Sequence, residues 1–256
     1  MIYLFLFGAI FGSFANVIIL RLPKGESIVS PPSRCNSCGV KVKWYDNIPI
    51  LSWFILRGRC RNCQAKFSFR YPLTELIMGI AFALAFYFIG WNWFLLEALI
   101  FLFALITASF IDIDHFILPD VFTLSGIVLG LVGALLNPER NFFDALLGCL
   151  FGGGFLWAIA YFYYVIRKEE GMGGGDIKLL AWIGAILGWK AIPFVIIASS
   201  LVGTVGGAIL AIRSQKGMKT VIPFGPYLAF GAGLYLFGGE QIGEWYINFF
   251  IPGLSQ

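Results

Sequence analysis

Long apolar segments alternate with short polar connections along most of the chain. Most of these segments hold the roughly 17–25 apolar residues that a helix needs to cross a bilayer. The sixth is short, and Gly184 and Gly188 within it indicate close packing against a neighbouring helix. We therefore expect an all-α polytopic membrane protein. The eight predicted membrane-spanning helices are 2–20, 74–90, 93–111, 120–136, 143–165, 177–189, 191–212 and 224–250.

One long polar stretch, residues 21–73, interrupts this pattern. It divides the chain into a first transmembrane helix at 1–20, a polar loop at 21–73 and a transmembrane domain at 74–256. The first helix does not have the pattern of a cleavable signal, because no Lys or Arg precedes it and a basic cluster follows it. We therefore count it among the membrane spans.

The composition indicates a surface that mostly faces lipid. Charged residues make up 12% of the chain and hydrophobic residues 59%, with a mean hydropathy of +0.84. A soluble domain typically carries about 25% charged residues, which this chain does not approach. The net charge of +4 is too small to indicate a nucleic-acid partner. The expected surroundings are the lipid bilayer.

The basic residues segregate to one side of the predicted spans. If the loop 21–73 faces the cytoplasm, the connections 112–119, 166–178 and 213–223 face it too. Only two of the Lys and Arg residues then fall outside, namely Arg140 and Lys190. Because basic residues concentrate in cytoplasmic connections, the positive-inside rule selects this orientation and places both chain termini outside.

Four cysteines form two Cys-x-x-Cys pairs in the polar loop, Cys35 with Cys38 and Cys60 with Cys63. This spacing is typical of a structural zinc ribbon, in which four thiolates surround Zn²⁺. A loop of about 50 residues has too little apolar area for a core of its own, so a metal would stabilise it. Two disulfides, four unbound thiols and an iron site are the alternatives. The reducing cytoplasm argues against disulfides.

The fifth cysteine, Cys149, lies alone in the fifth predicted span. We interpret it as a small apolar packing residue, because free cysteine is commonly buried in that role.

Two acidic residues lie at span ends on the same predicted membrane face, Asp112 after the third span and Asp176 before the sixth. Acidic groups at the lipid boundary are costly, which makes them functional candidates. Two neighbouring carboxyl groups can share one proton, so that one acts as base toward water and the other as acid toward a carbonyl. This aspartic-protease chemistry needs no histidine, and His115 is the only one in the chain.

Glycines 171 and 173–175 precede Asp176. Glycine permits close approach of another backbone, so an extended substrate could lie beside this carboxyl group. The run is not a phosphate-binding loop, because it lacks the spacing and the Lys-Ser/Thr that follow in that motif.

Simpler roles for the carboxyl groups stay open at this point. Asp176 could cap a helix that begins at Ile177, and Asp114 or Asp120 could cap one near Pro119. The acidic residues could also relay protons in a transporter, or the chain could be a membrane scaffold whose zinc ribbon binds a partner. A transporter predicts further ionisable residues in the middle of spans, where this chain is apolar.

Several motifs together resemble one family over nearly the whole chain. They are Gly12–Val17 with Arg21-Leu22-Pro23, Trp44–Pro49, Arg57–Cys63, Arg70-Tyr71-Pro72 with Glu75, Ile111–Asp114 with Leu118-Pro119-Asp120, and Gly171–Leu179. The last is similar to a Gly-x-Gly-Asp motif with a trailing lysine. The chain resembles the type IV prepilin peptidases, also called leader peptidase/N-methyltransferases. An archaeal-type preflagellin peptidase is the nearest alternative, and the tetracysteine loop argues against it.

The resemblance implies a protein of the bacterial inner membrane that cuts short basic leaders from type IV prepilins or pseudopilins. Cleavage would follow a glycine at the cytoplasmic face, in a type IV pilus or type II secretion pathway. The implied catalytic residues are Asp112 and Asp176; Asp112 is preferred to Asp114 because it directly follows the third span. The implied supporting residues are Gly173, Gly175, Lys178, Asp114 and Asp120. The two catalytic carboxyl groups need not be in hydrogen-bond contact before substrate binds.

The resemblance implies a second activity, methylation of the new N-terminal amine with S-adenosylmethionine as donor. In the family this activity is associated with the tetracysteine loop, and Gly58 matches a family glycine linked to it. No strand, Gly-rich turn and helix typical of a methyl-donor pocket is visible in the sequence. This second activity therefore rests on the resemblance alone.

Overall fold

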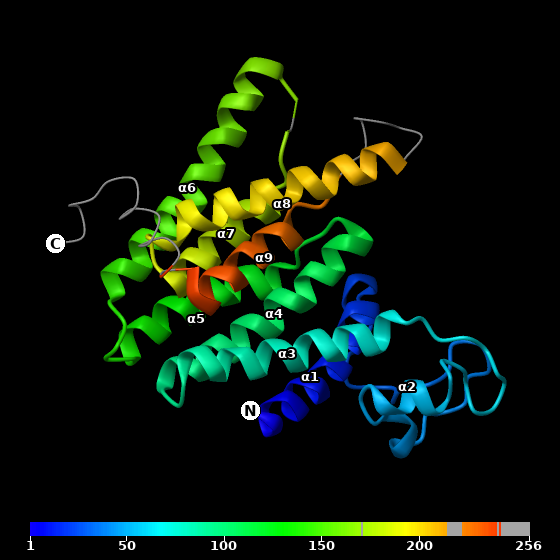
Figure 1. Cartoon of the computed structure of the whole chain (residues 1–256). Helices are drawn as coiled ribbons and strands as arrows, with labels where there is room; N and C mark the ends of the chain where they lie inside the picture. Colours follow the sequence, from blue (N-terminus) through cyan, green and yellow to red (C-terminus); the bar gives the residue numbers. More distant parts are fainter. Residues whose placement is uncertain (170, 214–221, 240, 242–256) are drawn as a thin grey trace. The chain divides into compact units, whose positions relative to one another are not determined.

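The computed structural model describes residues 1–169, 171–213, 222–239 and 241, which form helices and loops without β-strands (Figure 1). The chain divides into two compact units, Met1–Thr107 and Ala108–Gln256. The helices are α1 Ile2–Arg21, α2 Leu51–Ile55, α3 Arg70–Ile89, α4 Trp93–His115, α5 Asp120–Leu136, α6 Phe142–Arg167, α7 Gly174–Leu187, α8 Ala191–Arg213 and α9 Gly225–Leu234. Short 3₁₀ segments occur at Leu22–Lys24 and Trp44–Asn47, and a π-helical turn occurs at Tyr235–Gly239.

Many helices in the described part of the chain are long and apolar enough to cross a membrane. Helix α5 is a shorter apolar helix, and α7 has 14 residues. The expected all-helical membrane protein is therefore confirmed, while the count of eight spans stays a prediction; the end of the eighth, 224–250, lies outside the described residues. Within the part of the chain that the structure describes, the five segments long and apolar enough to cross a membrane are Ile2–Lys24, Arg70–Ile89, Trp93–His115, Phe142–Arg167 and Ala191–Ile209.

In the first unit, α1 and α3 pack with their backbones close together. A Cβ atom added at Gly8 would lie 2.6 Å from the carbonyl oxygen of Met78, and one added at Gly12 would lie 2.6 Å from Cα of Glu75. Small residues allow such close approach of apolar helices. The contact holds Glu75 against α1, at the end of α3 that follows the polar loop.

In the second unit, α7 is the most completely buried helix, with every residue from Leu179 to Ile186 buried. A helix that is apolar on all sides packs inside other helices, and α7 contacts α5, α6, α8 and α9. Its contact with α6 depends on glycine, because Cβ atoms on Gly148 and Gly184 would each overlap the other's backbone. A Cβ atom on Gly148 would also lie 2.7 Å from the carbonyl carbon of Gly188. The predicted close packing at Gly184 and Gly188 is confirmed.

The C-terminal end of α7 is held by Arg140. One guanidinium nitrogen, Nη2, donates hydrogen bonds of 2.7 Å to the carbonyl oxygen of Ala185 and 2.8 Å to that of Ile186. These carbonyl groups have no partner within a helix that ends at this point. Because one end of α7 is fixed in this way, its opposite end, which carries Asp176, is also held in place.

Candidate active site and metal centre

Asp112 lies inside the last turn of α4, which continues to His115. The helix is therefore longer than the predicted span, which ended before Asp112. The residue is buried, with 5% of its surface exposed. Its Oδ2 accepts a hydrogen bond of 3.2 Å from the backbone N–H of Gly225, the first residue of α9. The start of α9 therefore orients this carboxyl group.

Gly225 is a site residue that the sequence reasoning missed. A Cβ atom there would lie 2.6 Å from Oδ2 of Asp112, so the position has room only for glycine unless the carboxyl group moves. The sequence feature that could have pointed to this position is Pro226, because proline favours the first turn of a helix. It indicates where α9 begins, but not that this helix start contacts Asp112.

Asp176 is the third residue of α7, because the helix begins at Gly174 and not at Ile177. The N-cap is Gly173, and no side chain caps this helix end, so the interpretation of Asp176 as a helix cap is wrong. Asp176 is half-buried, and its carboxyl group interacts electrostatically with that of Asp112. Among the described residues no hydrogen bond joins the two groups.

Leu118 lies near two helix starts, that of α7, which carries Asp176, and that of α9, which contacts Asp112. A Cβ atom on Gly175 would lie 3.0 Å from Cβ of Leu118, and one on Gly225 would lie 3.1 Å from its Cδ2. The buried leucine thus spaces the N-terminal ends of α7 and α9. Gly173 and Gly174 instead face open space, with nothing within 4 Å of an added Cβ atom.

Lys178 and Asp120 form an ion pair of 2.6 Å between Nζ and Oδ1. Asp120 is the first residue of α5 and follows the N-cap, Pro119, so it is not itself the cap. The pair links α5 to the first turns of α7, two residues beyond Asp176. Asp114 lies exposed on the last turn of α4. The structure therefore brings Asp120 and Lys178 together, and their supporting role stays a prediction.

The four cysteines of the polar loop form one cluster. Their sulfur atoms all lie within 4.8 Å of one another, with 3.7 Å between Cys35 and Cys63 and 4.0 Å between Cys38 and Cys60. A tetrahedral zinc site with Zn–S bonds of about 2.3 Å needs sulfur atoms about 3.8 Å apart. All cysteines are free thiols, so no disulfide competes with a metal. The donor set and its spacing fit Zn²⁺.

The two cysteine pairs share one backbone design. The N–H of Cys35 donates to the carbonyl oxygen of Val40, and the N–H of Cys60 donates to that of Ala65, both at 2.9 Å. Each pair thus sits in a short hairpin turn, closed by the bridges Arg34–Lys41 and Arg59–Lys66. This repeat presents both pairs to a common centre.

The turn around the first pair favours the thiolate form of Cys35. The backbone N–H groups of Cys38 and Ser37 donate to its sulfur and lower the pKa of the Cys35 thiol to about 6. Since the thiolate is the form that binds zinc, this cysteine is ready to act as a ligand near neutral pH.

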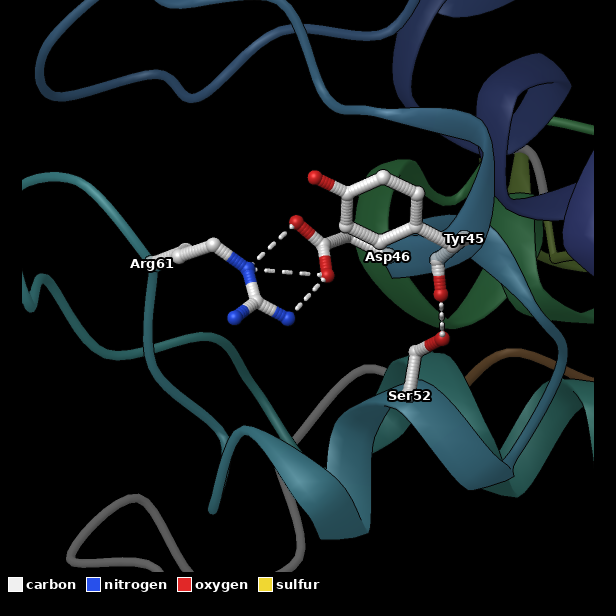
Figure 2. Close-up of polar contacts among 4 residues, drawn as sticks. All are labelled: Tyr45, Asp46, Ser52 and Arg61. Carbon is white, nitrogen blue, oxygen red and sulfur yellow. Dashed lines mark hydrogen bonds and ion pairs between the residues drawn. The ribbon is translucent and has the colours of Figure 1, made fainter.

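The segment between the cysteine pairs is tied to the second pair by Asp46 and Arg61 (Figure 2). Arg61 Nη2 lies 2.6 Å from Asp46 Oδ1, and Nε donates to both carboxylate oxygens at 3.0 and 3.1 Å. The Arg61 guanidinium therefore lowers the pKa of Asp46. In the same view, the Ser52 hydroxyl donates to the carbonyl oxygen of Tyr45 at 3.0 Å.

Gly58 is buried beside Trp53. It has a φ of 64°, which favours glycine, and a Cβ atom there would lie 2.7 Å from Cζ2 of the Trp53 indole. Both residues line a cavity of about 380 Å³ in the first unit. Sequence reasoning placed Gly58 near a methyl-transfer function by resemblance, but it did not identify Trp53.

Apolar helices of membrane-spanning length, with two neighbouring carboxyl groups at helix ends, define a multi-pass membrane protein with an acidic site. Two family models match the chain, Bacterial Peptidase A24 N-terminal domain over residues 6–89 and Type IV leader peptidase family over residues 99–208. The chain belongs to the type IV leader peptidase family.

Curated relatives support the same assignment. The chain is 38% identical to the prepilin leader peptidase/N-methyltransferase of Aeromonas hydrophila, over 96% of this chain and 93% of that protein. It is 36% identical to the protein of the same name from Pseudomonas aeruginosa, over 95% and 92%. For the Neisseria gonorrhoeae protein of that name the identity is 38%, over 86% and 84%. No solved structure matches the chain.

Proposed function

We propose that this multi-pass protein of the bacterial inner membrane removes the short basic leader from type IV prepilins or pseudopilins, cutting after a glycine at the cytoplasmic face. The observation that carries the proposal is the pair of neighbouring carboxyl groups, Asp112 and Asp176, at the ends of apolar helices. The name shared by the relatives supports the substrate class. It also supports a second activity, N-methylation of the new N-terminal residue.

In the proposed mechanism, Asp112 and Asp176 divide acid and base roles. One carboxylate takes a proton from water as the water oxygen attacks the scissile carbonyl carbon, and the other carboxyl group protonates the carbonyl oxygen. The C–N bond then breaks, its electron pair stays on nitrogen, and the amine takes up a proton from the pair. The Gly225 N–H holds Asp112 in one orientation throughout.

The surrounding residues would admit and align the substrate. Open space beside Gly173 and Gly174 gives an extended backbone access to Asp176. Gly175 fits against Leu118, and the ion pair of Lys178 with Asp120 fixes the start of α7 relative to α5. We include Asp114 among the supporting residues because it lies on the same turn as Asp112.

The proposed topology has eight spans, with the loop 21–73 in the cytoplasm and both termini outside. The segregation of Lys and Arg supports it. Two of the basic residues counted, Lys216 and Lys219, lie outside the described residues. We further propose the division into a first helix at 1–20, a loop at 21–73 and a peptidase domain at 74–256.

The tetracysteine cluster would hold a structural Zn²⁺ ion through Cys35, Cys38, Cys60 and Cys63. Four thiolates around zinc form a closed site without an open position for a substrate. The ion would therefore stabilise the loop and take no part in peptide cleavage.

The N-methylation needs a methyl donor, S-adenosylmethionine by resemblance. When bound, such a sulfonium donor would supply an electrophilic methyl group for the amine nitrogen. The cavity lined by Gly58 and Trp53 fits a ligand of this class, because about 380 Å³ lies within the range of small-molecule sites.

Cleavage of a pilin-type precursor by the purified full-length protein in detergent tests the peptidase function. Asp112→Asn and Asp176→Asn are each expected to lower the rate at least about 100-fold, because each removes an acid–base group. Glu139→Gln is the matched control, since Glu139 lies in the loop between α5 and α6, outside the proposed site. Normal cleavage by either aspartate variant would refute the carboxyl pair.

A transporter or a scaffold with a zinc ribbon is the remaining alternative, and the family assignment does not favour it. Both alternatives predict that a well-folded, zinc-loaded protein leaves the precursor uncut. The cleavage experiment therefore separates them from the peptidase.

A further inference from the structure

The short helix α2 presents an apolar face that stays uncovered in the described part of the chain. Leu51, Phe54 and Ile55 are 60%, 57% and 73% exposed. Residues three and four apart lie on one side of a helix, so these side chains form a single face, which we call the α2 apolar face. A different side of the helix is turned toward the loop, where the Ser52 hydroxyl donates to the carbonyl oxygen of Tyr45.

A hydrogen bond fixes α2 at the level where α3 enters the membrane. Oε2 of the buried Glu75 accepts a 2.6 Å hydrogen bond from the backbone N–H of Ile50, the N-cap of α2. Glu75 follows the first residue of α3, Arg70, by roughly 7 Å along the axis of this candidate membrane span. The headgroup region on each side of a bilayer is about 5–7 Å deep. Helix α2 therefore begins at the depth of the lipid headgroups.

The α2 apolar face continues into the apolar surface of α3. The Phe54 ring meets the Trp53 ring edge-on, and the Trp53 ring meets that of Phe69 in the same way, both with 5.3 Å between centroids. Phe69, the N-cap of α3, is exposed, as are Leu73 and Leu76. Side chains at these spacings lie on one side of a helix. An apolar surface thus runs without a break from the membrane-spanning part of α3 to α2.

Basic residues border this surface. Arg57 follows the C-cap of α2, Lys66 lies in the segment that leads to α3, and both are exposed. Among the described residues, neither forms an ion pair with an acidic side chain. The whole loop 21–73 contains ten Lys and Arg residues against two acidic ones, Glu26 and Asp46. This charge is complementary to anionic phospholipids, which attract basic segments to a bilayer surface.

We infer that the α2 apolar face is an interfacial anchor, which inserts its three apolar side chains among the headgroups of an anionic bilayer while Arg57 and Lys66 contact the lipid phosphates. Amphipathic segments with aromatic and aliphatic side chains on one face and basic residues beside it bind bilayers in this way. The anchor holds the tetracysteine loop against the membrane where α1 ends and α3 begins. The inference goes beyond leader cleavage and N-methylation and depends on neither.

Two protein partners could cover the same face, the apolar segment of a precursor or a second copy of this chain. The bilayer is favoured because the surface is continuous with that of a membrane-spanning helix and because Glu75 holds α2 at headgroup depth. A precursor with a basic leader gains nothing from Arg57 and Lys66, since like charges repel. Each of these partners gives a product of different mass in the test below.

Photo-crosslinking of the full-length protein tests the anchor in nanodiscs of phosphatidylglycerol and phosphatidylethanolamine. With p-benzoylphenylalanine in place of Phe54, lipid adducts are expected in at least about fivefold higher yield than with the same probe in place of Trp44. Trp44 is the matched control, because it is 82% exposed in the same loop and lies outside the α2 apolar face. If the first variant does not fold, the probe in place of Ile55 on the same face takes its role.

The contribution of charge is tested with the same probe. Arg57→Gln combined with Lys66→Gln is expected to lower the lipid-adduct yield about two- to fivefold in these nanodiscs, because each basic residue adds to the attraction by anionic lipids. In nanodiscs of phosphatidylcholine alone, the same two substitutions should change the yield by less than about 1.5-fold. An equal loss in both lipid compositions would refute the contact with anionic headgroups.

Equal lipid-adduct yields at positions 54 and 44 would overturn the anchor. A predominant adduct between two copies of the chain would also overturn it, in favour of an interface between copies. Replacement of the lipid adduct by a precursor adduct, when a pilin-type precursor is added, would overturn it in favour of a substrate-docking surface. Leader cleavage is measured on the same samples, so that a failure of the peptidase function is recognised separately.

Discussion

The backbone N–H of Gly225 donates a hydrogen bond of 3.2 Å to Oδ2 of Asp112, between residues 113 positions apart in the sequence. The bond is buried, and glycine is the residue that leaves room for the carboxyl group. Gly225 is therefore a positioning residue for the proposed peptidase, because it acts on the substrate only through Asp112.

Replacing Gly225 by alanine is expected to displace the Asp112 carboxyl group and slow leader cleavage about 10- to 100-fold, because small misplacements of a reacting group are costly. Gly233→Ala is the matched control in the same helix, since the atom nearest to its added Cβ lies 4.0 Å away. Both variants are assayed for kcat and KM on one precursor. Equal rates for the two variants would show that the Gly225 contact is not needed.

Breaking the ion pair of Lys178 with Asp120 is expected to reduce cleavage only about two- to fivefold, because partly exposed pairs contribute about 0.2–1 kcal/mol. Lys178→Met and Asp120→Asn should have similar effects, and the double variant should be no worse than either single one. A double-mutant cycle of cleavage rates measures this coupling. Fully additive losses would mean that the two residues act independently.

Removing any ligand of the tetracysteine cluster is expected to abolish zinc binding. Cys35→Ser or Cys60→Ser should reduce the metal content from one zinc per chain to less than half, because a closed structural site needs all four thiolates. Cys149→Ser should keep its zinc, since Cys149 lies on α6, outside the cluster. Metal analysis of the purified proteins decides the matter; zinc loss from the Cys149 variant as well would argue against this site.

Replacing either of two glycines in α6 and α7 by alanine is expected to change the stability of the protein, in opposite directions. Gly184→Ala is expected to destabilise the protein by about 1–3 kcal/mol, because the added Cβ overlaps the backbone of Gly148. Gly154→Ala is expected to raise stability by about 0.5–1 kcal/mol, because its Cβ meets nothing within 4 Å in a helix interior. Thermal unfolding in detergent compares them. A stable Gly184 variant would contradict the close packing.

The Asp46–Arg61 pair predicts a pH dependence of loop stability. Arg61 lowers the pKa of Asp46, so the pair stabilises the folded loop above the ordinary aspartate value and stops doing so as pH falls through the lowered pKa. The difference in melting temperature between wild type and Asp46→Asn should therefore stay constant from pH 8 to about 5 and shrink below about pH 4. It should be small, because Arg61 is half-exposed. If the difference in melting temperature vanished near neutral pH, the pH dependence would belong to another group.

Most of the long helices and the grouping of the four loop cysteines could be predicted from the sequence, because both depend on local order along the chain. The apolar runs predict α5 at its observed residues, and they predict α1, α3, α4, α6, α7 and α8 to within a few positions. Each Cys-x-x-Cys pair forms its own turn through backbone bonds between residues at most nine apart, as with Ser33 and Val42. The two aspartates could be selected too, since acidic residues at apolar boundaries are rare.

The surroundings of those aspartates and the position of the cavity became visible only in the folded chain. Asp112 accepts a hydrogen bond from Gly225, 113 positions away, and Glu75 holds the backbone before α2 through Ile50, 25 positions away. No periodicity encodes such contacts, because they follow from how closely glycine lets one helix approach another.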